Sequence, residues 1–357
     1  MEQLKDRNVL IVGGGVAGLH TAFHLSRLGV NVLLVEKQSH LGGHGLLLHE
    51  DSLTGDSIKD LVKAKVEAVR GIPGIRVLTN TVVSAATRKG TCFNVTLQKV
   101  PEDGDETTLT VIEADAIVVA TGFNLFDASR MRQYGYGRYK DVMNNLDFEK
   151  LTDPDGPTGG KVLRPSNGKA PRSIVFITCV GSRDVKHSTN CCRIGCPVTL
   201  SQALSIKKGH GGDTEVYVCY IDIRAVGRGV EESYRKAMEA EVIFIQGQPS
   251  EIRPGDDGSL RVEIFDESTG KLLSLSGDLI VLATGISPNT ELSETLGLDI
   301  DQDGFYRTEH SKFETCTMSV PGIFLAGAAE GPKDIGETLI HASRTALKVV
   351  EYLAGLT

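Results

Sequence analysis

Four of the seven cysteines of this chain fall within one short window. Cys179 is followed after eleven residues by Cys191-Cys192, and Cys196 comes after three more. Four thiolates are the usual ligand set of an iron–sulfur cluster, and here one distant ligand accompanies three close ones. The spacing matches neither a ferredoxin-type C-x2-C-x2-C run nor a paired C-x2-C zinc ribbon. The window therefore predicts a metal or redox centre, with an iron–sulfur cluster as the leading interpretation.

Two other chemistries suit the same cysteines and stay open. A structural zinc ion accepts four thiolates equally well. Redox-active thiols without a metal are the second alternative, for example a strained disulfide between the adjacent Cys191 and Cys192. Packing alone explains the window least well, because adjacent cysteines in a loop flanked by Asn190 and Gly195 are poorly placed to fill a core.

The elements around the window must bring these thiols together. Residues 173–178 have the apolar pattern of a buried strand, and Cys179 follows at its carboxyl end, where parallel sheets bind ligands. A helix is predicted from Pro197 to Lys208, with Pro197 as its first residue and Cys196 near the N-cap. Free N–H groups and the positive end of the helix dipole would then face an anionic cluster.

A nucleotide-binding fingerprint lies at the amino-terminal end of the chain. Residues 8–12 predict a strand, Gly13-Gly14-Gly15-Val16-Ala17-Gly18 gives the G-x-G-x-x-G turn, and a helix follows to about Leu28. The next strand, 31–35, ends at Glu36, whose carboxylate suits ribose hydroxyls. In this strand–turn–helix–strand–acid context the fingerprint predicts a bound dinucleotide.

Several later segments resemble flavoproteins of the glutathione reductase superfamily and favour FAD over NAD at this site. Lys37 with Gly42-Gly43-His44 resembles their second glycine loop, although a solvated loop histidine is an equal reading of His44. Ala120-Thr121-Gly122 resembles their strand ending over the cofactor, and Ala283-Thr284-Gly285 repeats it. The stretch from Gly327 to Ile335 resembles their last strand and helix N-terminus, which complete the FAD site.

These elements predict an α/β protein with the architecture of that superfamily. Residues 1–122 and 286–357 form a Rossmann-like FAD-binding domain, and 173–285 form an inserted unit that resembles an NAD domain and carries the cysteines. Residues 123–172 form a linker or interface segment. A dinucleotide is not expected in the inserted unit, because only Gly181 of a fingerprint remains there. Arg224 and Arg228 could hold a phosphate at the end of the next strand, but pairing with Glu231 and Glu232 is the expected use.

Composition excludes some classes of function. Asp and Glu number 46 against 38 Lys and Arg, a formal net charge of -8, so the basic footprint of a nucleic-acid binder is absent. No apolar run reaches the roughly 18 residues of a membrane span, and no signal-peptide pattern is present. We therefore expect a cytoplasmic protein without a membrane span.

Longer motifs resemble the A-type subunit of heterodisulfide reductase, over almost the whole chain but only in its FAD core, which is like thioredoxin reductase. They are Tyr134–Tyr139, Gly156–Gly160, Arg164–Lys169, Cys179–Asp184, Asp222–Arg224 and Gly331–Ile335. The length is closest to the short A-type subunit of the sulfur-oxidising heterodisulfide-reductase-like system. The resemblance implies FAD, one 4Fe-4S cluster on the four cysteines, a homodimer, partner subunits of the B and C type, and a lipoate-binding protein as sulfur carrier.

Two departures from the family pattern qualify what the resemblance implies. Gly327-Ala328 replaces the usual Gly-Asp, so Asp334 or amides near Ile335 must supply the flavin contacts. Electron-bifurcating relatives carry a lysine at the position of Ser201, which counts against bifurcation here.

The sequence thus predicts an oxidoreductase subunit that transfers electrons between FAD and thiol or disulfide chemistry on partner subunits. The alternatives are an NAD(P)H-dependent disulfide reductase and a zinc-bearing scaffold subunit. No side chain is predicted to be catalytic. The predicted cluster ligands are Cys179, Cys191, Cys192 and Cys196. The predicted FAD contacts are Gly13, Gly15, Val16, Ala17, Gly18, Glu36, Lys37, Gly42, Gly43, His44, Val83, Ala120, Thr121, Gly122, Gly327, Ala328, Asp334 and Ile335.

Overall fold

The computed structural model describes residues 4–49, 54, 56–100, 108–210 and 213–356. The chain divides into two compact units, and the second is inserted into the first. The first unit contains Met1–Leu46, Lys59–Asn124 and Ser287–Thr357, and the second contains Leu47–Ile58 and Leu125–Ile286.

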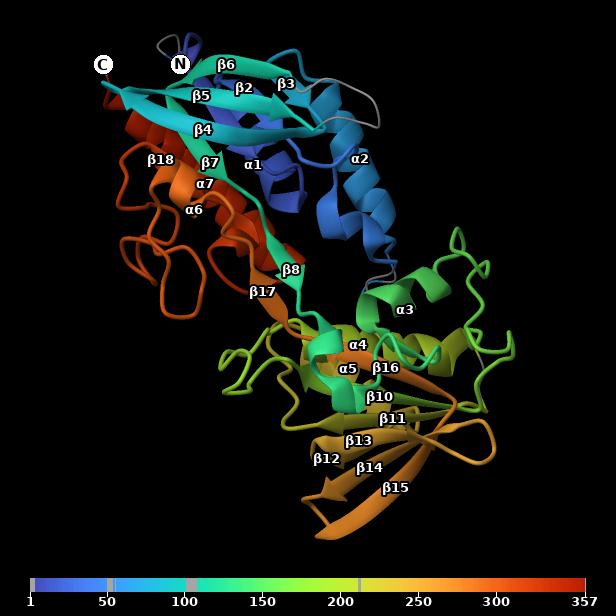
Figure 1. Ribbon diagram of the computed structural model, residues 1–357. Coiled ribbons are helices and arrows are strands. Elements are labelled where there is room, and N and C mark those ends of the chain that lie inside the picture. The colour runs from blue at the N-terminus through green and yellow to red at the C-terminus, as the bar shows by residue number, and fades with distance from the viewer. Residues whose placement is uncertain (1–3, 50–53, 55, 101–107, 211–212, 357) are drawn as a thin grey trace. The chain divides into compact units, whose positions relative to one another are not determined.

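The first unit is built on a five-stranded parallel sheet in the order β18-β7-β1-β2-β3 (Figure 1). The strands predicted at 8–12 and 31–35 are confirmed with the same bounds. The parallel strands are β1 (Asn8–Val12), β2 (Asn31–Val35), β3 (Ile75–Leu78), β7 (Ala116–Val119) and β18 (Ile323–Leu325). The remaining elements are α1 (Val16–Arg27), η2 (Gly43–Leu47), α2 (Ile58–Arg70), β4 (Thr81–Lys89), β5 (Cys92–Lys99), β6 (Leu109–Ala114), α6 (Ser293–Leu296), η6 (Gly327–Ala329) and α7 (Ile335–Ala354).

Alternation along the strands gives this unit three layers. Val9 and Ile11 pack in one core with residues of α1 and α7. Leu10 and Val12 point to the opposite face and pack in a second core with the antiparallel sheet β4-β5-β6. Because successive side chains of a strand face opposite sides, a β-branched and fully apolar strand is suited to a sheet that is covered on both faces.

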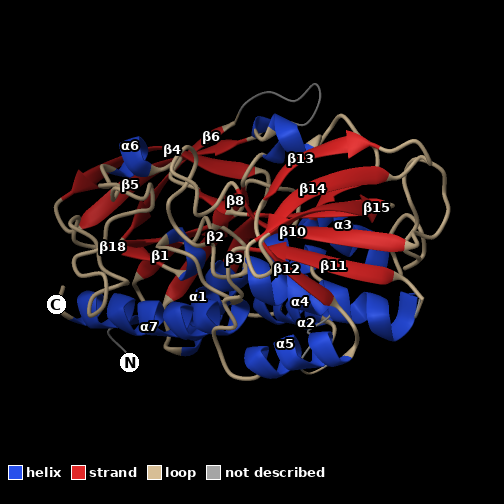
Figure 2. Ribbon diagram, turned by 90° about the horizontal axis from the view of Figure 1, so that it is seen from below, coloured by secondary structure: helices blue, strands red, loops and turns tan. Residues whose placement is uncertain are grey.

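The second unit repeats this plan with the parallel order β12-β11-β10-β16-β9. Figure 2 shows α4 and α5 on one face of this sheet and β13-β14-β15 on the other. The parallel strands are β9 (Val142–Asn144), β10 (Ser173–Val180), β11 (Glu215–Tyr220), β12 (Ile243–Gln246) and β16 (Leu279–Thr284). The remaining elements are η3 (Ala128–Arg130), η4 (Arg132–Tyr134), α3 (Asn145–Thr152), α4 (Gly195–Ser205), η5 (Ile206–His210), α5 (Val230–Glu239), β13 (Pro249–Pro254), β14 (Leu260–Asp266) and β15 (Lys271–Gly277).

The segment 123–172, predicted as a linker, contributes regular structure. Its first strand β8 (Phe123–Leu125) forms a two-stranded sheet with β17 (Ile286–Pro288). From Leu125 onward the segment belongs to the second unit, where β9 adds a strand to the parallel sheet and α3 packs Phe148 into its core.

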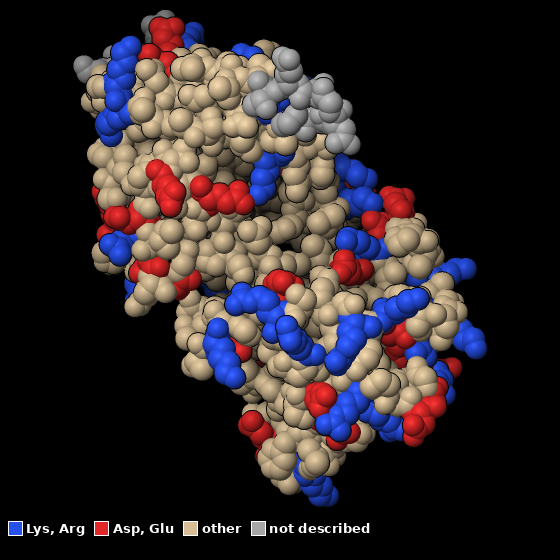
Figure 3. All heavy atoms as spheres, viewed as in Figure 1, with Lys and Arg blue, Asp and Glu red and all other residues tan. Residues whose placement is uncertain are grey.

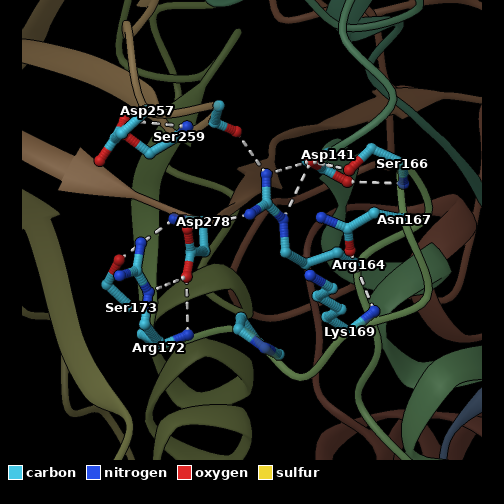
Figure 4. Close-up of polar contacts among 12 residues, drawn as sticks. Asp141, Arg164, Ser166, Asn167, Lys169, Arg172, Ser173, Asp257, Ser259 and Asp278 are labelled. Carbon is cyan, nitrogen blue, oxygen red and sulfur yellow. Dashed lines mark hydrogen bonds and ion pairs between the residues drawn. The ribbon is translucent and has the colours of Figure 1, made fainter.

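Arg164 fastens the same segment to the sheet through a buried ion-pair network (Figure 4). Its Nη2 donates to the carboxylate of Asp141 at 2.9 Å, and its Nη1 donates to that of Asp278 at 3.1 Å. Asp278 also accepts from the backbone N–H of Arg172 at 2.8 Å. Since all three charged groups of the Asp141–Arg164–Asp278 set are buried, removing one partner would leave an uncompensated charge and cost about 3–5 kcal/mol.

Candidate functional site

The glycine turn of the first unit joins β1 to α1 and is shaped by close backbone packing. A Cβ at Gly13 would lie 2.3 Å from the Ala120 carbonyl oxygen, and one at Gly18 would lie 1.9 Å from the Gly13 oxygen. Gly15 differs, because a Cβ there would meet no described atom within 4 Å and its φ is -74°. The space beside Gly15 is therefore open on the side where a dinucleotide phosphate would lie.

The N-terminus of α1 is suited to an anion. Its N-cap, Gly15, makes no side-chain cap hydrogen bond, and its first turn holds no acid. Glu36, which is buried, accepts from the Gly14 N–H at 2.7 Å and the Gln38 N–H at 2.8 Å. The second glycine loop docks on the first, since the Gly42 N–H donates to the Gly14 oxygen at 2.8 Å. The structure thus brings the two glycine loops and the acid to one edge of the sheet.

The predicted FAD contacts outside the glycine turns differ in their surroundings. His44 is partly buried in η2, where its ring packs 4.9 Å from that of Phe123, and burial lowers its pKa. Lys37 instead lies half-exposed and pairs with Glu291 at 3.3 Å. Val83 is buried in the core beneath β4-β5-β6.

Asn289 is a candidate that the sequence reasoning missed. Its carbonyl oxygen accepts from the Thr121 hydroxyl at 3.2 Å, and its side-chain amide donates to the Thr121 oxygen at 3.3 Å. Its buried Oδ1 has no hydrogen-bond partner among the described residues. Such an orphaned acceptor in a cofactor site suits a ligand donor. The available signal was its position just after the second Ala-Thr-Gly strand.

The last strand and helix of the first unit meet the same edge. A Cβ at Gly327 would lie 2.5 Å from the Cβ of Ala17, so this turn packs on the start of α1. The Gly327 N–H donates to Nδ1 of His341, a second residue that the sequence reasoning missed, at 2.9 Å. Asp334 is the N-cap of α7 and accepts from the Glu337 N–H at 2.7 Å, which leaves the amide of Ile335 outside the capping bond. Ala328, in the same turn, is buried.

Three features fit a phosphate-bearing dinucleotide with a polar ring system. They are the open space beside Gly15, the N-terminus of α1 without a side-chain cap, and the Asn289 side-chain oxygen without a partner among the described residues.

The four predicted cysteine ligands lie around one pocket in the second unit. The residues that line this cysteine pocket are Thr178, Cys179, Arg183, Cys191, Cys192, Arg193, Gly195, Cys196, Asp222 and Arg224. Strand β10 has a register shift between Ile177 and Val180, so Cys179 sits in an irregularity at the strand end, with a φ of +60°. Arg183 and Arg193 also have positive φ values, 57° and 61°. Such strained backbone clusters at functional sites.

The helix prediction was wrong by two residues at this point. Helix α4 begins at Gly195 instead of Pro197, so Cys196 lies in its first turn and not beside its N-cap. Pro197 is tolerated there because first-turn N–H groups have no partner within the helix. The N-cap, Ile194, makes no side-chain cap, and the first turn contains no acid.

Ser182 closes the loop that carries the two adjacent cysteines. Its hydroxyl donates to the Asn190 carbonyl at 2.6 Å and accepts from the Cys192 N–H at 3.2 Å. The Arg183 N–H also donates to the Asn190 oxygen, at 3.1 Å. These bonds hold Cys192 beside the strand end that carries Cys179, although eleven residues separate Cys179 from Cys191 in the sequence.

Arginines surround the thiols. Arg183 donates to the Cys179 sulfur and forms an ion pair with Asp222, which also accepts from Arg224 at 3.3 Å. The expected pairing of Arg224 with Glu231 and Glu232 was therefore wrong. Guanidinium groups beside sulfur ligands stabilise negative charge on them.

The four thiols differ in acidity. Cys192 donates a hydrogen bond that lowers the pKa of Cys191 to about 6, and the same bond raises the pKa of Cys192. Burial raises the pKa values of Cys179 and, to about 11, Cys196. A bound metal would deprotonate all four thiols.

The donor set suits a metal centre, but the four side chains as placed leave little space between them. The pocket has a volume of only about 10 Å³. Within the described part of the chain, no group of three or more His, Cys, Asp or Glu side chains is arranged to hold a single metal ion. A centre that binds both Cys191 and Cys192 would replace the hydrogen bond between their thiols.

A family model described as pyridine nucleotide-disulphide oxidoreductase matches residues 5–154 and 191–346. The chain belongs to this family. Membership makes it an oxidoreductase chain and supports FAD as the dinucleotide of the first unit. It also confirms the predicted fold class.

Curated relatives agree with the predicted resemblance. The A-type iron-sulfur subunit of CoB–CoM heterodisulfide reductase from Methanocaldococcus jannaschii is 33% identical over 96% of this chain and 64% of its own length. One of two such subunits from Methanopyrus kandleri is also 33% identical, over 96% of this chain and 63% of its own length. The chain therefore spans less than two thirds of these relatives.

Solved structures show the same fold. Thioredoxin reductase from T. acidophilum superposes with a TM-score of 0.66 at 17% identity, covering 99% of this chain and all of the other. Thioredoxin reductase from Lactococcus lactis gives 0.65 at 19% identity, covering 98% of this chain and all of the other. At such identities the likeness concerns the fold alone. No helix in the described residues is both long and apolar enough to cross a bilayer.

Proposed function

We propose that this chain is the FAD and 4Fe-4S electron-transfer subunit of a heterodisulfide-reductase-like complex. The observation that carries the proposal is the convergence of Cys179, Cys191, Cys192 and Cys196 on one pocket, in a chain whose other unit carries an FAD-type site at the corresponding turn. The relatives' name, which calls them the iron-sulfur subunit of heterodisulfide reductase, supports it. FAD converts between two-electron and one-electron steps, and an iron–sulfur cluster carries single electrons.

The chain's own residues have defined tasks in this proposal. The turn at Gly15 and the first turn of α1 would hold the FAD pyrophosphate, and Glu36 orders the turn through Gly14. His341 accepts from the Gly327 N–H and would hold this turn for the cofactor. In the second unit, Ser182 holds the loop and Arg183 offsets the charge of the thiolates. No proton-transferring side chain is required for electron transfer itself.

The complex would supply the thiol or disulfide chemistry on other subunits. We propose a cytoplasmic homodimer that works with B-type and C-type subunits and a lipoate-binding protein, as in the sulfur-oxidising system. Analysis of the complex purified with its native partners tests this, with copurification of B-type and C-type subunits as the expected result. Purification of the chain alone from native cells would contradict it.

An NAD(P)H-dependent disulfide reductase is the second candidate, because the family is described by pyridine nucleotides. The sequence lacks a redox C-x-x-C motif, and only Gly181 of a second fingerprint remains. Mixing the oxidised protein with NADH or NADPH separates the candidates. The first proposal predicts no bleaching of the flavin absorbance within seconds, whereas rapid bleaching would favour the second candidate.

A further inference from the structure

A polar cluster lies between α3 and α4 in the second unit, and none of its residues lines the cysteine pocket. The two helices pack in one core, where Phe148 and Leu151 of α3 meet Leu200 and Leu204 of α4. Polar groups of both helices are enclosed beside this core. They belong to Asn145 and Glu149 of α3 and to Thr199 and Gln202 of α4, which we call the α3–α4 cluster.

Gln202 joins the two helices and keeps one oxygen without a partner. Its Nε2 donates to the Asn145 carbonyl oxygen at 2.8 Å and to the Glu149 carboxylate at 2.7 Å. Because both partners are acceptors, turning the amide over would lose both bonds. Gln202 is only 3% exposed, and its Oε1 has no hydrogen-bond partner among the described residues. This oxygen is bonded to the same carbon as Nε2, so it lies close to the Glu149 carboxylate.

Thr199 provides a second oxygen without a partner. It lies three residues before Gln202 on α4, so the two side chains are neighbours on one side of the helix. Thr199 is only 1% exposed, and its hydroxyl bonds to no other group in the part of the chain that the structure describes. Buried polar groups without partners are rare in native proteins, and an ion or a water molecule commonly accounts for them.

Glu149 brings a negative charge to the same place. Its other carboxylate oxygen accepts from the His49 N–H at 3.0 Å, and burial of the carboxyl group raises its pKa. Lys and Arg side chains gather over part of the visible face of the second unit (Figure 3). None of those that the structure describes forms an ion pair with Glu149, and the ionisable groups near it are His49 and Asp153. The carboxylate therefore has no Lys or Arg counter-ion within the described residues.

The charge and the two oxygens together favour one kind of occupant. A proton on Glu149 would remove the charge but leave the oxygens of Gln202 and Thr199 unpaired. A water molecule could pair both oxygens but would leave the charge. A cation with oxygen ligands satisfies all three groups, and oxygen atoms are the ligands of hard cations. One carboxylate balances a singly charged ion, whereas a divalent ion would leave an excess positive charge in a buried place.

We propose that the α3–α4 cluster binds one alkali-metal ion, Na⁺ or K⁺, with Glu149 as the charged ligand and Gln202 and Thr199 as neutral oxygen ligands. The ion would tie α3 to α4 and, through Glu149, hold the backbone at His49. Because α4 carries Cys196 in its first turn, the ion would also brace the helix that borders the cysteine pocket. This site goes beyond the proposed function and depends on neither FAD nor an iron–sulfur cluster.

Diffraction from crystals of the holoprotein soaked in RbCl tests the occupancy of the site, because Rb⁺ replaces Na⁺ or K⁺ and scatters anomalously. We expect an anomalous peak in contact with Glu149 in the wild-type protein. Glu149→Gln keeps the shape of the side chain and removes its charge, so the peak should disappear. Glu239→Gln, at an exposed acid of α5, is the control and should keep it. A wild-type crystal without the peak would overturn the proposal.

Hydrogen exchange of the α4 amides, followed by mass spectrometry, identifies the ion in solution. NaCl and KCl are compared at equal ionic strength with choline chloride, whose cation is too large for an enclosed site. We expect exchange to slow at least about threefold in the salt of the preferred ion. Thr199→Val replaces the hydroxyl by a methyl group, so the half-saturating concentration of that salt should rise about tenfold.

Two outcomes would assign the site to another occupant and overturn the proposal. One is equal exchange in all three salts, which would leave water as the partner of the unpaired oxygens. The other is an infrared band of a protonated carboxyl group in the wild-type protein that disappears in Glu149→Gln, which would identify a proton. Iron and FAD analysis of the same samples keeps this result apart from the proposed function, because loss of either cofactor leaves the ion site intact.

Discussion

The two units share one architecture and differ at one turn. Each has a five-stranded parallel sheet between helices and a three-stranded antiparallel sheet, and the strand orders correspond. In the first unit, residues 13–15 join the first strand to its helix, whereas in the second unit residues 181–194 make the same connection. The short turn exposes backbone N–H groups, and the long one delivers thiols and guanidinium groups.

An acid beyond the second strand takes part in both turns. Glu36 follows β2 and accepts from the backbone N–H of Gly14. Asp222 follows β11 and accepts from the side chain of Arg183. The same edge of a parallel sheet is therefore suited to a different class of ligand in each unit. A phosphate needs bare backbone at the turn, and a metal centre needs side chains, which only a longer loop provides.

Loss of one ligand in the second unit should have the largest effect. We expect Cys192→Ser to abolish cluster binding while the FAD content stays at the wild-type level, because each cofactor is held by its own unit. Iron analysis and flavin absorbance of the anaerobically purified variant measure both. Cys219→Ser, at a buried free cysteine in the same sheet, is the matched control and should keep its iron. Full iron content in Cys192→Ser would contradict the ligand set.

A substitution in the glycine turn should weaken FAD binding to the first unit and leave the second unit unaffected. Gly15→Ala suits the local backbone and fills the space beside the turn, so the protein should fold and lose about 100-fold or more in FAD affinity. Fluorescence titration of the deflavinated protein measures this, with iron content unchanged. Gly209→Ala, which also adds a methyl group in open space, is the control. Wild-type FAD affinity in Gly15→Ala would disprove the assigned phosphate position.

Removing one charge near the thiols should produce an intermediate effect. Arg183→Gln should lower the reduction potential of the second unit's centre by on the order of 100 mV, because a cation no longer stabilises the more negative reduced state. An EPR-monitored redox titration measures the shift. Arg253→Gln, at an exposed pair with Glu251, should leave the potential unchanged. A higher potential in Arg183→Gln would contradict the assigned role.

Lowering the pH should reduce the free energy of unfolding of the first unit, and this is the smallest of the expected effects. Burial lowers the pKa of His341 to about 4. The unfolded chain takes up a proton near pH 6.5, so the free energy of unfolding falls as the pH drops from about 6.5 to 4, by on the order of 2 kcal/mol. Urea unfolding at neutral and acidic pH measures this loss. His341→Asn should reduce the pH dependence but not remove it, because burial also lowers the pKa of His20 to about 4. An unchanged pH dependence in the variant would contradict this account.

The sequence predicts the elements whose patterns are local. The bounds of β1 and β2 follow from their apolar residues and the glycines and acid that end them. The convergence of the four cysteines follows from a strand end and a helix start that share one sheet edge.

Features that depend on distant partners escape sequence reasoning. Strand β9 has three residues and lies among turn formers, so only its pairing with β16 defines it. The role of Asn289 depends on its contact with Thr121, which is far away in the sequence. The role of His341 depends on its contact with Gly327, which lies on another element. The start of α4 at Gly195 was missed because glycine is a poor helix former and Pro197 resembled a first helical residue.

Metal and flavin analysis of the anaerobically purified wild-type chain, combined with EPR after dithionite reduction, tests whether the chain holds both FAD and a 4Fe-4S cluster. We expect about four iron atoms and one FAD per chain, with the EPR signal of a reduced 4Fe-4S cluster. Zinc without iron, bound in a protein that still holds FAD, would contradict the assignment of the cysteine pocket as a one-electron centre.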